Sequence, residues 1–486
     1  MQDEEKRSEL KERVARGVAW SMAEKIGSTA LQVAVSLTIL SLLTREDLGI
    51  MALLTAVSAV AVVLADSGFS QTLIRKKSPT AGDFKAVFVF NVGVATLLYA
   101  LFVGLAPTAA AYYNMPELEE LAPVFFLILP ANALCTVQHT QLIRQFRFAL
   151  ISKITFAASL LSGVTAIGMA MAGCGVWSIV IQRVVFYAMR TSLMWVYGSW
   201  NARGRGDFRA LWGMASYSCS LMATELITTF YNKIPQFFLG RIYAADTLGA
   251  FDQAVKLKDQ PLTAAVQAVQ SVTFPALSKI GDDRARLAES YRQVVMITLF
   301  VLCPMMLGLS AVAHDLFAAI LGAEWMPTVP YLRVAALAGV FYPVAMIAFN
   351  VLKVKSGGGL LLRIEIFKKV LMTLAFAVTI PWSVDAVVWG LVVIAAGEMA
   401  VNMWAAERFV GIGLWRWTKT LLPILVLSAA MYAVVAVVGM ELDAAPLVKL
   451  IVEVLVGIAV YAAAAFVLRL EAMREVVQIA LRQVRK

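Results

Sequence analysis

Residues 252–270 read DQAVKLKDQPLTAAVQAVQ, a polar stretch inside otherwise apolar, helical sequence. At about 100° per residue, the spacing i, i+4, i+7 gathers its charged and amide side chains into one helical stripe. The members of this stripe are Asp252, Lys256, Asp259, Gln260, Thr263, Gln267 and Gln270. Facing lipid, such a stripe would be prohibitively costly, so it must line water or pair with other helices. We therefore expect the chain to be built around a cavity that this helix lines.

The composition is that of a polytopic membrane protein. Of the 486 residues, 60% are hydrophobic and only 15% are charged, against about 45–50% and about 25% in soluble domains. The apolar runs are continuous over about 20 residues, which favours helices over the alternating strands of a barrel. Residues 1–16 mix both charge signs and precede a long apolar segment, so no cleaved signal peptide is expected.

Fourteen segments are long enough to span a bilayer, which predicts an all-α membrane protein with fourteen transmembrane helices. Their approximate limits are 18–43, 49–70, 84–106, 118–140, 150–172, 176–197, 211–232, 246–273, 292–314, 328–351, 360–381, 384–406, 418–439 and 445–469. With a cytoplasmic N-terminus, most of the 42 Lys and Arg residues fall in inner loops, as the positive-inside rule requires. Outer loops carry acids instead. Both termini are therefore predicted to be cytoplasmic.

The chain also repeats itself. Three short matches recur in the same order in the two halves: WSMA at 20–23 with WGMA at 212–215, Leu48-Gly49 with Leu248-Gly249, and VWS at 176–178 with VWG at 388–390. We predict two pseudo-symmetric six-helix lobes of the same orientation around a central cavity. The N-lobe covers 1–197, a cytoplasmic linker 198–210 and the C-lobe 211–407, and 408–486 holds helices 13 and 14 and a basic cytoplasmic tail.

Polar side chains concentrate in the first two helices of each half, which we expect to form the cavity wall. The candidate cations are Lys25, Lys256 and Arg183, and an anionic group crossing the membrane could meet Lys25 and Lys256 at different depths. The candidate acids are Glu24, Asp252 and Asp259. A structural interpretation stays open, because Asp252 and Lys256 have ordinary i, i+4 salt-bridge spacing and Lys25 adjoins Glu24.

Several functions are excluded by what the chain lacks. It has no catalytic constellation, no sizeable outer loop and no nucleotide-binding motif, so we predict neither an enzyme nor an ATP-driven pump. The four cysteines are scattered through apolar segments without metal-ligand spacing, so no metal site is expected.

Two stretches resemble a known family. GVAW at 17–20 with LLTREDLG at 42–49, and LGAFDQAVKL at 248–257 with FPALS at 274–278, resemble the polysaccharide-exporter branch of the oligosaccharide-lipid flippases. That branch belongs to the multidrug/oligosaccharidyl-lipid/polysaccharide (MOP) superfamily. The resemblance covers the first eight predicted helices and implies two six-helix lobes, two extra helices and transport by alternating access. Family members often carry an aromatic–basic pair where this chain has Phe251-Asp252, whereas Lys256 matches the usual basic position.

This resemblance implies a flippase of the bacterial inner membrane, which moves polyprenyl-pyrophosphate-linked polysaccharide repeat units from the cytoplasmic to the periplasmic leaflet. The three candidate cations would then hold the pyrophosphate, and the three acids would couple transport to a proton or Na⁺, with no other cofactor. The side chains expected to hydrogen-bond sugar hydroxyls are Gln32, Thr224, Asn232, Gln260, Gln267 and Gln270. Membrane lipids and polysaccharide polymerase or assembly proteins are the expected partners. Two alternatives remain: a cation-coupled drug exporter of the same fold, and a non-transporting scaffold for polysaccharide assembly.

Overall fold

The computed structural model describes residues 38, 40–198, 200–201, 206–280, 283–356 and 358–475. Within these ranges the chain is helical and contains no strand. Ten of the described helices are long and apolar enough to cross a membrane, in agreement with the predicted polytopic membrane protein. The first predicted span, 18–43, lies almost entirely outside the described residues, and the count of fourteen and the side of each terminus stay predictions.

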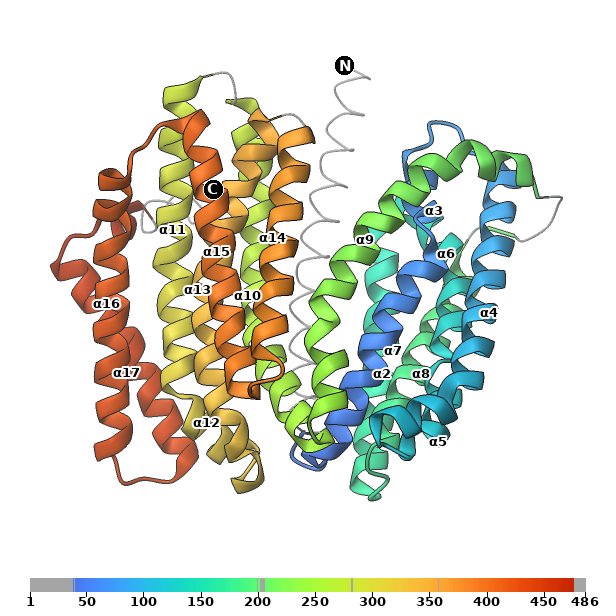
Figure 1. Cartoon of the computed structure of the whole chain (residues 1–486), viewed down its shortest axis with the longest axis horizontal. Helices are drawn as coiled ribbons and strands as arrows, with labels where there is room; N and C mark the ends of the chain where they lie inside the picture. Colours follow the sequence, from blue (N-terminus) through green and yellow to red (C-terminus); the bar gives the residue numbers. More distant parts are fainter. Residues whose placement is uncertain are drawn as a thin grey trace, which may run out of the picture. The chain divides into compact units, whose positions relative to one another are not determined.

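The described residues form two compact units that divide at Gly249. The helices of the first unit are α2 (Arg45–Asp66), α3 (Phe69–Arg75), α4 (Ala81–Tyr113), α5 (Glu117–Phe125), α6 (Ile128–Arg144), α7 (Phe148–Met171), α8 (Trp177–Tyr197), α9 (Phe208–Ile242) and the first residues of α10 (Ala245–Lys279). In this unit α9 packs along α2 and α4, and α8 packs against α6 and α7 (Figure 1). The helix after the basic linker thus packs with helices of the first half of the sequence.

The second unit begins at Ala250, within α10. Its other helices are α11 (Arg284–Ala311), α12 (Ala313–Ile320), the 3-10 helix η1 (Ala323–Thr328), α13 (Val329–Lys355), α14 (Gly358–Thr379), α15 (Val384–Val410), α16 (Leu414–Glu441) and α17 (Pro446–Val467). The central helix is α13, which packs on α11 and α15. Helix α16 packs against α11, and α17 packs against α16 and α12, so the last two helices form the edge of this unit.

Local sequence sets several helix ends. A capping box opens α2, where the Thr44 hydroxyl accepts from the Asp47 N–H at 3.2 Å and the Asp47 carboxylate accepts from the Thr44 N–H at 3.1 Å. Thr80 and Asp83 repeat this arrangement at the start of α4. The predicted span 118–140 is broken into α5 and α6, because Pro130 has no N–H to donate to the Phe126 carbonyl one turn earlier.

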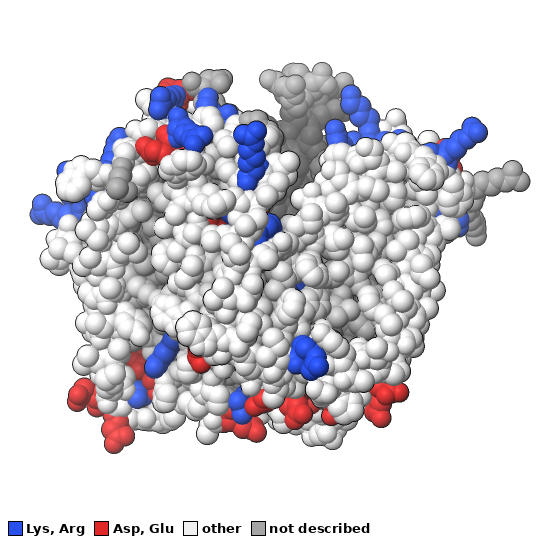
Figure 2. All heavy atoms as spheres, in the orientation of Figure 1, with Lys and Arg blue, Asp and Glu red and all other residues white. Residues whose placement is uncertain are grey.

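Charge is segregated along the helices. Figure 2 shows Lys and Arg gathered mainly at one end of the helices in each unit, and Asp and Glu mainly at the opposite end. This is the distribution from which the sequence predicts that the basic end is cytoplasmic. The middle of the helices is covered almost entirely by uncharged side chains on the visible face (Figure 2).

Candidate functional site

The polar stripe of α10 is present in the second unit, and an ion pair begins it. The Lys256 Nζ lies 2.5 Å from the Asp252 Oδ2. The Asp252 side chain is only 6% exposed, whereas that of Lys256 is 41% exposed. A buried carboxylate needs a counter-ion, so Lys256 neutralises Asp252 while its ammonium group keeps access to the surface of the unit.

Three further members of the stripe are exposed one above the other along α10, namely Gln260, Thr263 and Gln267. Of the other two, Asp259 keeps a half-exposed side chain and pairs with the neighbouring Lys258 at 2.8 Å, whereas the Gln270 side-chain N–H donates to the Met346 sulfur of α13 at 2.6 Å. The surface of α10 therefore carries one ammonium group, two amides and a hydroxyl in a row, with the Asp259 carboxylate beside them. Such a row suits a ligand that carries both an anionic group and many hydroxyl groups.

The first unit holds a second polar site, a cavity of about 420 Å³. It lies among α2, α3, α6, α8 and α9, and its lining includes the acids Asp66 and Glu225 together with His139 and Arg190. The Ser70 hydroxyl donates to the Asp66 carboxylate. The Arg190 Nε is buried and has no hydrogen-bond acceptor within the described part of the chain. An unsatisfied guanidinium N–H beside a cavity can bind an anionic or carbonyl oxygen.

The remaining predicted site residues either lie on exposed helix surfaces or fall outside the described residues. Arg183 is exposed on α8 and does not line this cavity. Thr224 and Asn232 are exposed on α9, where the Thr224 hydroxyl donates to the Ser220 carbonyl at 2.9 Å. Glu24, Lys25 and Gln32 lie outside the described residues.

Two residues deserve more weight than the sequence reasoning gave them. Arg190 lies two turns after Arg183 on α8 and lines the cavity that Arg183 does not. His139 lies on α6 with Asn132, Thr136 and Ile143, all of which line the cavity. These four positions follow i, i+4, i+7, i+11 spacing on one face of α6, and three of them are polar. A search for polar helical stripes outside the first two helices of each half would have found this face.

Comparison with known proteins gives these sites a context. Curated relatives include the succinoglycan biosynthesis transport protein ExoT of Rhizobium meliloti, 24% identical over 68% of this chain and 67% of ExoT. The teichuronic acid biosynthesis protein TuaB of Bacillus subtilis is 22% identical over 87% of this chain and 88% of TuaB. The lipopolysaccharide biosynthesis protein WzxC of Escherichia coli is 22% identical over 76% of this chain and 75% of WzxC.

Solved structures show the same fold. The lipid II flippase MurJ, in an inward closed conformation, matches with a TM-score of 0.73 over 93% of this chain and 99% of that chain, at 14% identity. An inward-facing multidrug resistance MATE transporter of the MOP superfamily matches with a TM-score of 0.59 over 79% of this chain and 94% of that chain, at 15% identity. The model of a family described as polysaccharide biosynthesis protein matches residues 39–330. This match confirms the resemblance seen in the sequence, and the chain belongs to the polysaccharide biosynthesis protein family.

Proposed function

We propose that this protein is a flippase that moves a polyprenyl-pyrophosphate-linked oligosaccharide from the cytoplasmic to the periplasmic leaflet of a bacterial inner membrane. Its family and its relatives in succinoglycan, teichuronic acid and lipopolysaccharide synthesis support a role in polysaccharide production. The fold that it shares with MurJ is compatible with lipid-linked cargo.

The observation that carries this proposal is the exposed row on α10, with Lys256 followed by Gln260, Thr263 and Gln267. A pyrophosphate needs cations, and an oligosaccharide needs many hydrogen-bonding groups that are not charged. The row supplies both on one helix face. A drug exporter for organic cations would need acids and aromatic rings in place of this ammonium group and these amides.

The ion pair at the start of the row offers a coupling mechanism. When the pyrophosphate binds Lys256, the buried Asp252 loses part of its counter-charge, and a carboxylate in that position is costly. Uptake of one proton or one Na⁺ by Asp252 would remove the cost, and its release would restore the Lys256–Asp252 pair. Asp259 and Glu24 are further candidates for this step.

Transport can be tested in cells that lack the protein. A deletion strain is expected to accumulate lipid-linked repeat units that are accessible only from the cytoplasmic side, and the wild-type gene should restore polymer export. Lys256→Ala should fail to restore it at normal protein levels. The matched control is Arg333→Ala, which removes an exposed cation of α13 that belongs neither to the row nor to the cavity of the first unit.

Each outcome has a clear meaning. Restored export with Arg333→Ala but not with Lys256→Ala supports the proposal. Full export with Lys256→Ala excludes the row as the pyrophosphate site. If the deletion strain shows normal repeat-unit translocation and becomes sensitive to cationic drugs, the protein is a drug exporter. If repeat units cross the membrane normally and only polymerisation fails, it is a scaffold.

A further inference from the structure

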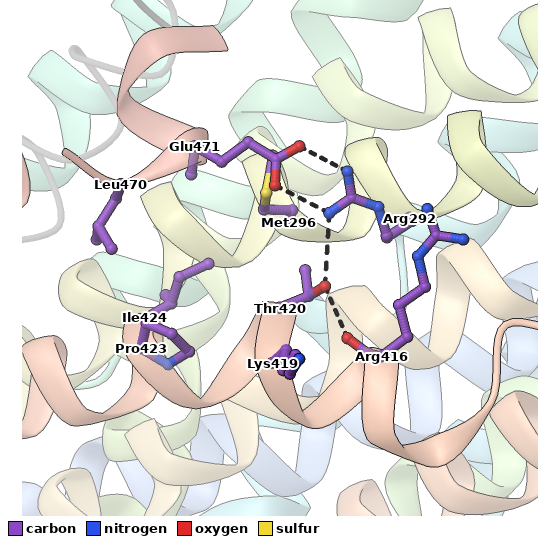
Figure 3. A pocket seen from close by; sticks show the side chains of 10 residues that line it. Arg292, Met296, Arg416, Lys419, Thr420, Pro423, Ile424, Leu470 and Glu471 are labelled. Carbon is purple, nitrogen blue, oxygen red and sulfur yellow. Dashed lines mark hydrogen bonds and ion pairs between the residues drawn. The ribbon is translucent and has the colours of Figure 1, made fainter.

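A smaller cavity in the second unit has no part in the proposed transport. Its volume is about 340 Å³, and it lies where the first turns of α16, the N-terminal part of α11 and the chain that follows α17 come together (Figure 3). Its lining residues are Arg292, Met296, Arg416, Lys419, Thr420, Pro423, Ile424, Leu470, Glu471 and Ala472. The charged members lie at the basic end of the unit.

One wall of the cavity is a closed network of ion pairs. The Arg292 guanidinium contacts both oxygens of the Glu471 carboxylate, at 3.1 Å through Nη1 and 2.6 Å through Nη2 (Figure 3). The same guanidinium lies 2.7 Å from Glu289, and the Arg416 Nη2 lies 2.8 Å from the other Glu289 oxygen. The Arg292 side chain is only 10% exposed and is paired with both Glu289 and Glu471, so we assign it a structural role and not a role in ligand binding.

The other wall carries a charge that this network leaves unbalanced. Lys419 is exposed and, among the described residues, has no carboxylate partner; its Nζ lies 5.2 Å from the centre of the Trp415 ring. The three cations Arg292, Arg416 and Lys419 therefore face two carboxylates, those of Glu289 and Glu471. One positive charge is left without a counter-charge. Lys419 and the outer nitrogens of Arg416 keep hydrogen-bond donors for a ligand.

The surroundings of the cavity are those of a membrane–water boundary. Trp415 is 71% exposed, as is typical of a tryptophan at the level of lipid headgroups. Further along α16, Leu422 is 53% and Val426 59% exposed, so this face of the helix suits contact with acyl chains. The cavity itself combines the charged residues with apolar ones, including Met296 and Ile424. A site with charged and apolar parts at this level fits an amphipathic ligand.

We propose that this cavity binds the phosphate group of an anionic phospholipid of the adjacent leaflet. The phosphodiester of such a lipid would accept hydrogen bonds from Lys419 and Arg416, and its single negative charge would balance the unpaired cation. Its acyl chains would follow the apolar outer face of α16. The Arg292–Glu471 pair remains intact and holds the chain after α17 against α11, which keeps the cavity in shape.

The test uses the full-length protein, delipidated in detergent and reconstituted into nanodiscs of phosphatidylcholine with or without phosphatidylglycerol. Native mass spectrometry then counts the phosphatidylglycerol molecules retained by wild type, Lys419→Ala and Lys419→Glu. We expect wild type to retain phosphatidylglycerol in preference to phosphatidylcholine, Lys419→Ala to bind it about five-fold more weakly, and Lys419→Glu more weakly still. The control is Arg363→Ala, which removes an exposed cation of α14 that does not line the cavity.

A second arm separates lipid from free phosphate. Inorganic phosphate is added to protein in pure phosphatidylcholine nanodiscs, with chloride at equal ionic strength as control, and the unfolding temperature is recorded. Stabilisation of wild type by phosphate alone, lost in Lys419→Ala, would replace the lipid by a soluble phosphate as the ligand and overturn the proposal. Equal phosphatidylglycerol retention by wild type, Lys419→Ala and Arg363→Ala would overturn it as well. Selective loss in the Lys419 variants supports it.

Discussion

Gly49 and Gly249 hold the start of α2 against the start of α10, backbone to backbone. A Cβ atom added to Gly49 would lie 1.8 Å from the Ala245 carbonyl oxygen, and one added to Gly249 would lie 1.9 Å from the Arg45 carbonyl oxygen. The arrangement is reciprocal, since each glycine faces the first turn of the other helix. The Leu-Gly match that suggests a sequence repeat is therefore also a packing contact within the first unit.

Substitution of either glycine should destabilise the protein. In Gly49→Ala or Gly249→Ala, the new methyl group must push the helix ends apart, because a carbonyl oxygen of the backbone cannot rotate away as a side chain can. Overpacking of this kind costs about 1–3 kcal/mol and occasionally more. The measurement is the unfolding temperature of the purified protein, together with its level in the membrane.

Gly93→Ala is the matched control for the loss of stability expected in Gly49→Ala and Gly249→Ala. Gly93 lies within α4, and a Cβ there would meet no atom within 4 Å. Alanine is favoured over glycine in a helix by about 1 kcal/mol, so this variant should be neutral or slightly stabilised. If all three variants behave alike, the close approach of α2 and α10 does not contribute to stability.

Much of the fold follows from the sequence, because an apolar run of about 20 residues has few alternatives to a helix in a membrane, where backbone polar groups must bond within the segment. Each described long helix corresponds to a predicted span. The short helices α3, α12 and η1 were not predicted, since they occupy loops or the ends of spans, where hydropathy carries little information. The helix α5 was predicted only as the first part of the longer span 118–140. The sequence repeat also says nothing about packing, so it did not indicate that α9 packs along α2.

The candidate site was predictable in part, for a reason of helix geometry. On a helical wheel, Thr263 and Gln267 each lie within about 20° of Lys256, and all three remain accessible at the surface of the unit. Asp252 and Gln270 lie about 40° to one side of Lys256. That edge turns toward neighbouring helices, which buries Asp252 and places Gln270 on Met346. Sequence spacing defines the stripe but not which edge faces a neighbour.

A pair of variants separates the stabilising role of Lys256 from its proposed role in transport. Lys256→Ala leaves the buried Asp252 without its counter-ion, and breaking a buried pair in this way costs about 3–5 kcal/mol at most; the partial exposure of Lys256 reduces the loss. Adding Asp252→Asn should recover stability but not transport, because the cation for the pyrophosphate and the proposed coupling carboxylate are then both missing. Unfolding temperature and polymer export are measured together. Recovery of both properties in the double variant would assign Lys256 a structural role only.

Arg144 should be needed for the connection between α3 and α4. Its Nη1 lies 2.6 Å from the Leu73 carbonyl oxygen and 2.8 Å from those of Ile74 and Lys76, at the C-terminal end of α3. The last carbonyls of a helix lack intrahelical donors and carry partial negative charge, which a guanidinium satisfies. Arg144→Ala should lower the free energy of unfolding by roughly 1–3 kcal/mol. Arg147→Ala, which removes an exposed arginine three residues later, should have little effect in the same thermal unfolding assay.

Acid should weaken the contact between Arg292 and Glu471. The hydrogen bond from Arg292 lowers the pKa of Glu471 below its usual value, against a smaller opposing effect of burial. A carboxyl group with a depressed pKa stabilises the folded state above its unfolded pKa of about 4.3, and this contribution is lost as the pH falls through the lower, folded-state pKa. Because the Glu471 side chain is 55% exposed, solvent screening limits the contribution to about 0–1 kcal/mol. Unfolding temperatures measured from neutral to acidic pH should therefore fall less steeply for Glu471→Gln than for wild type, whereas Glu475→Gln should follow wild type. Parallel curves for all three proteins would show that the Arg292–Glu471 pair has no net effect on stability.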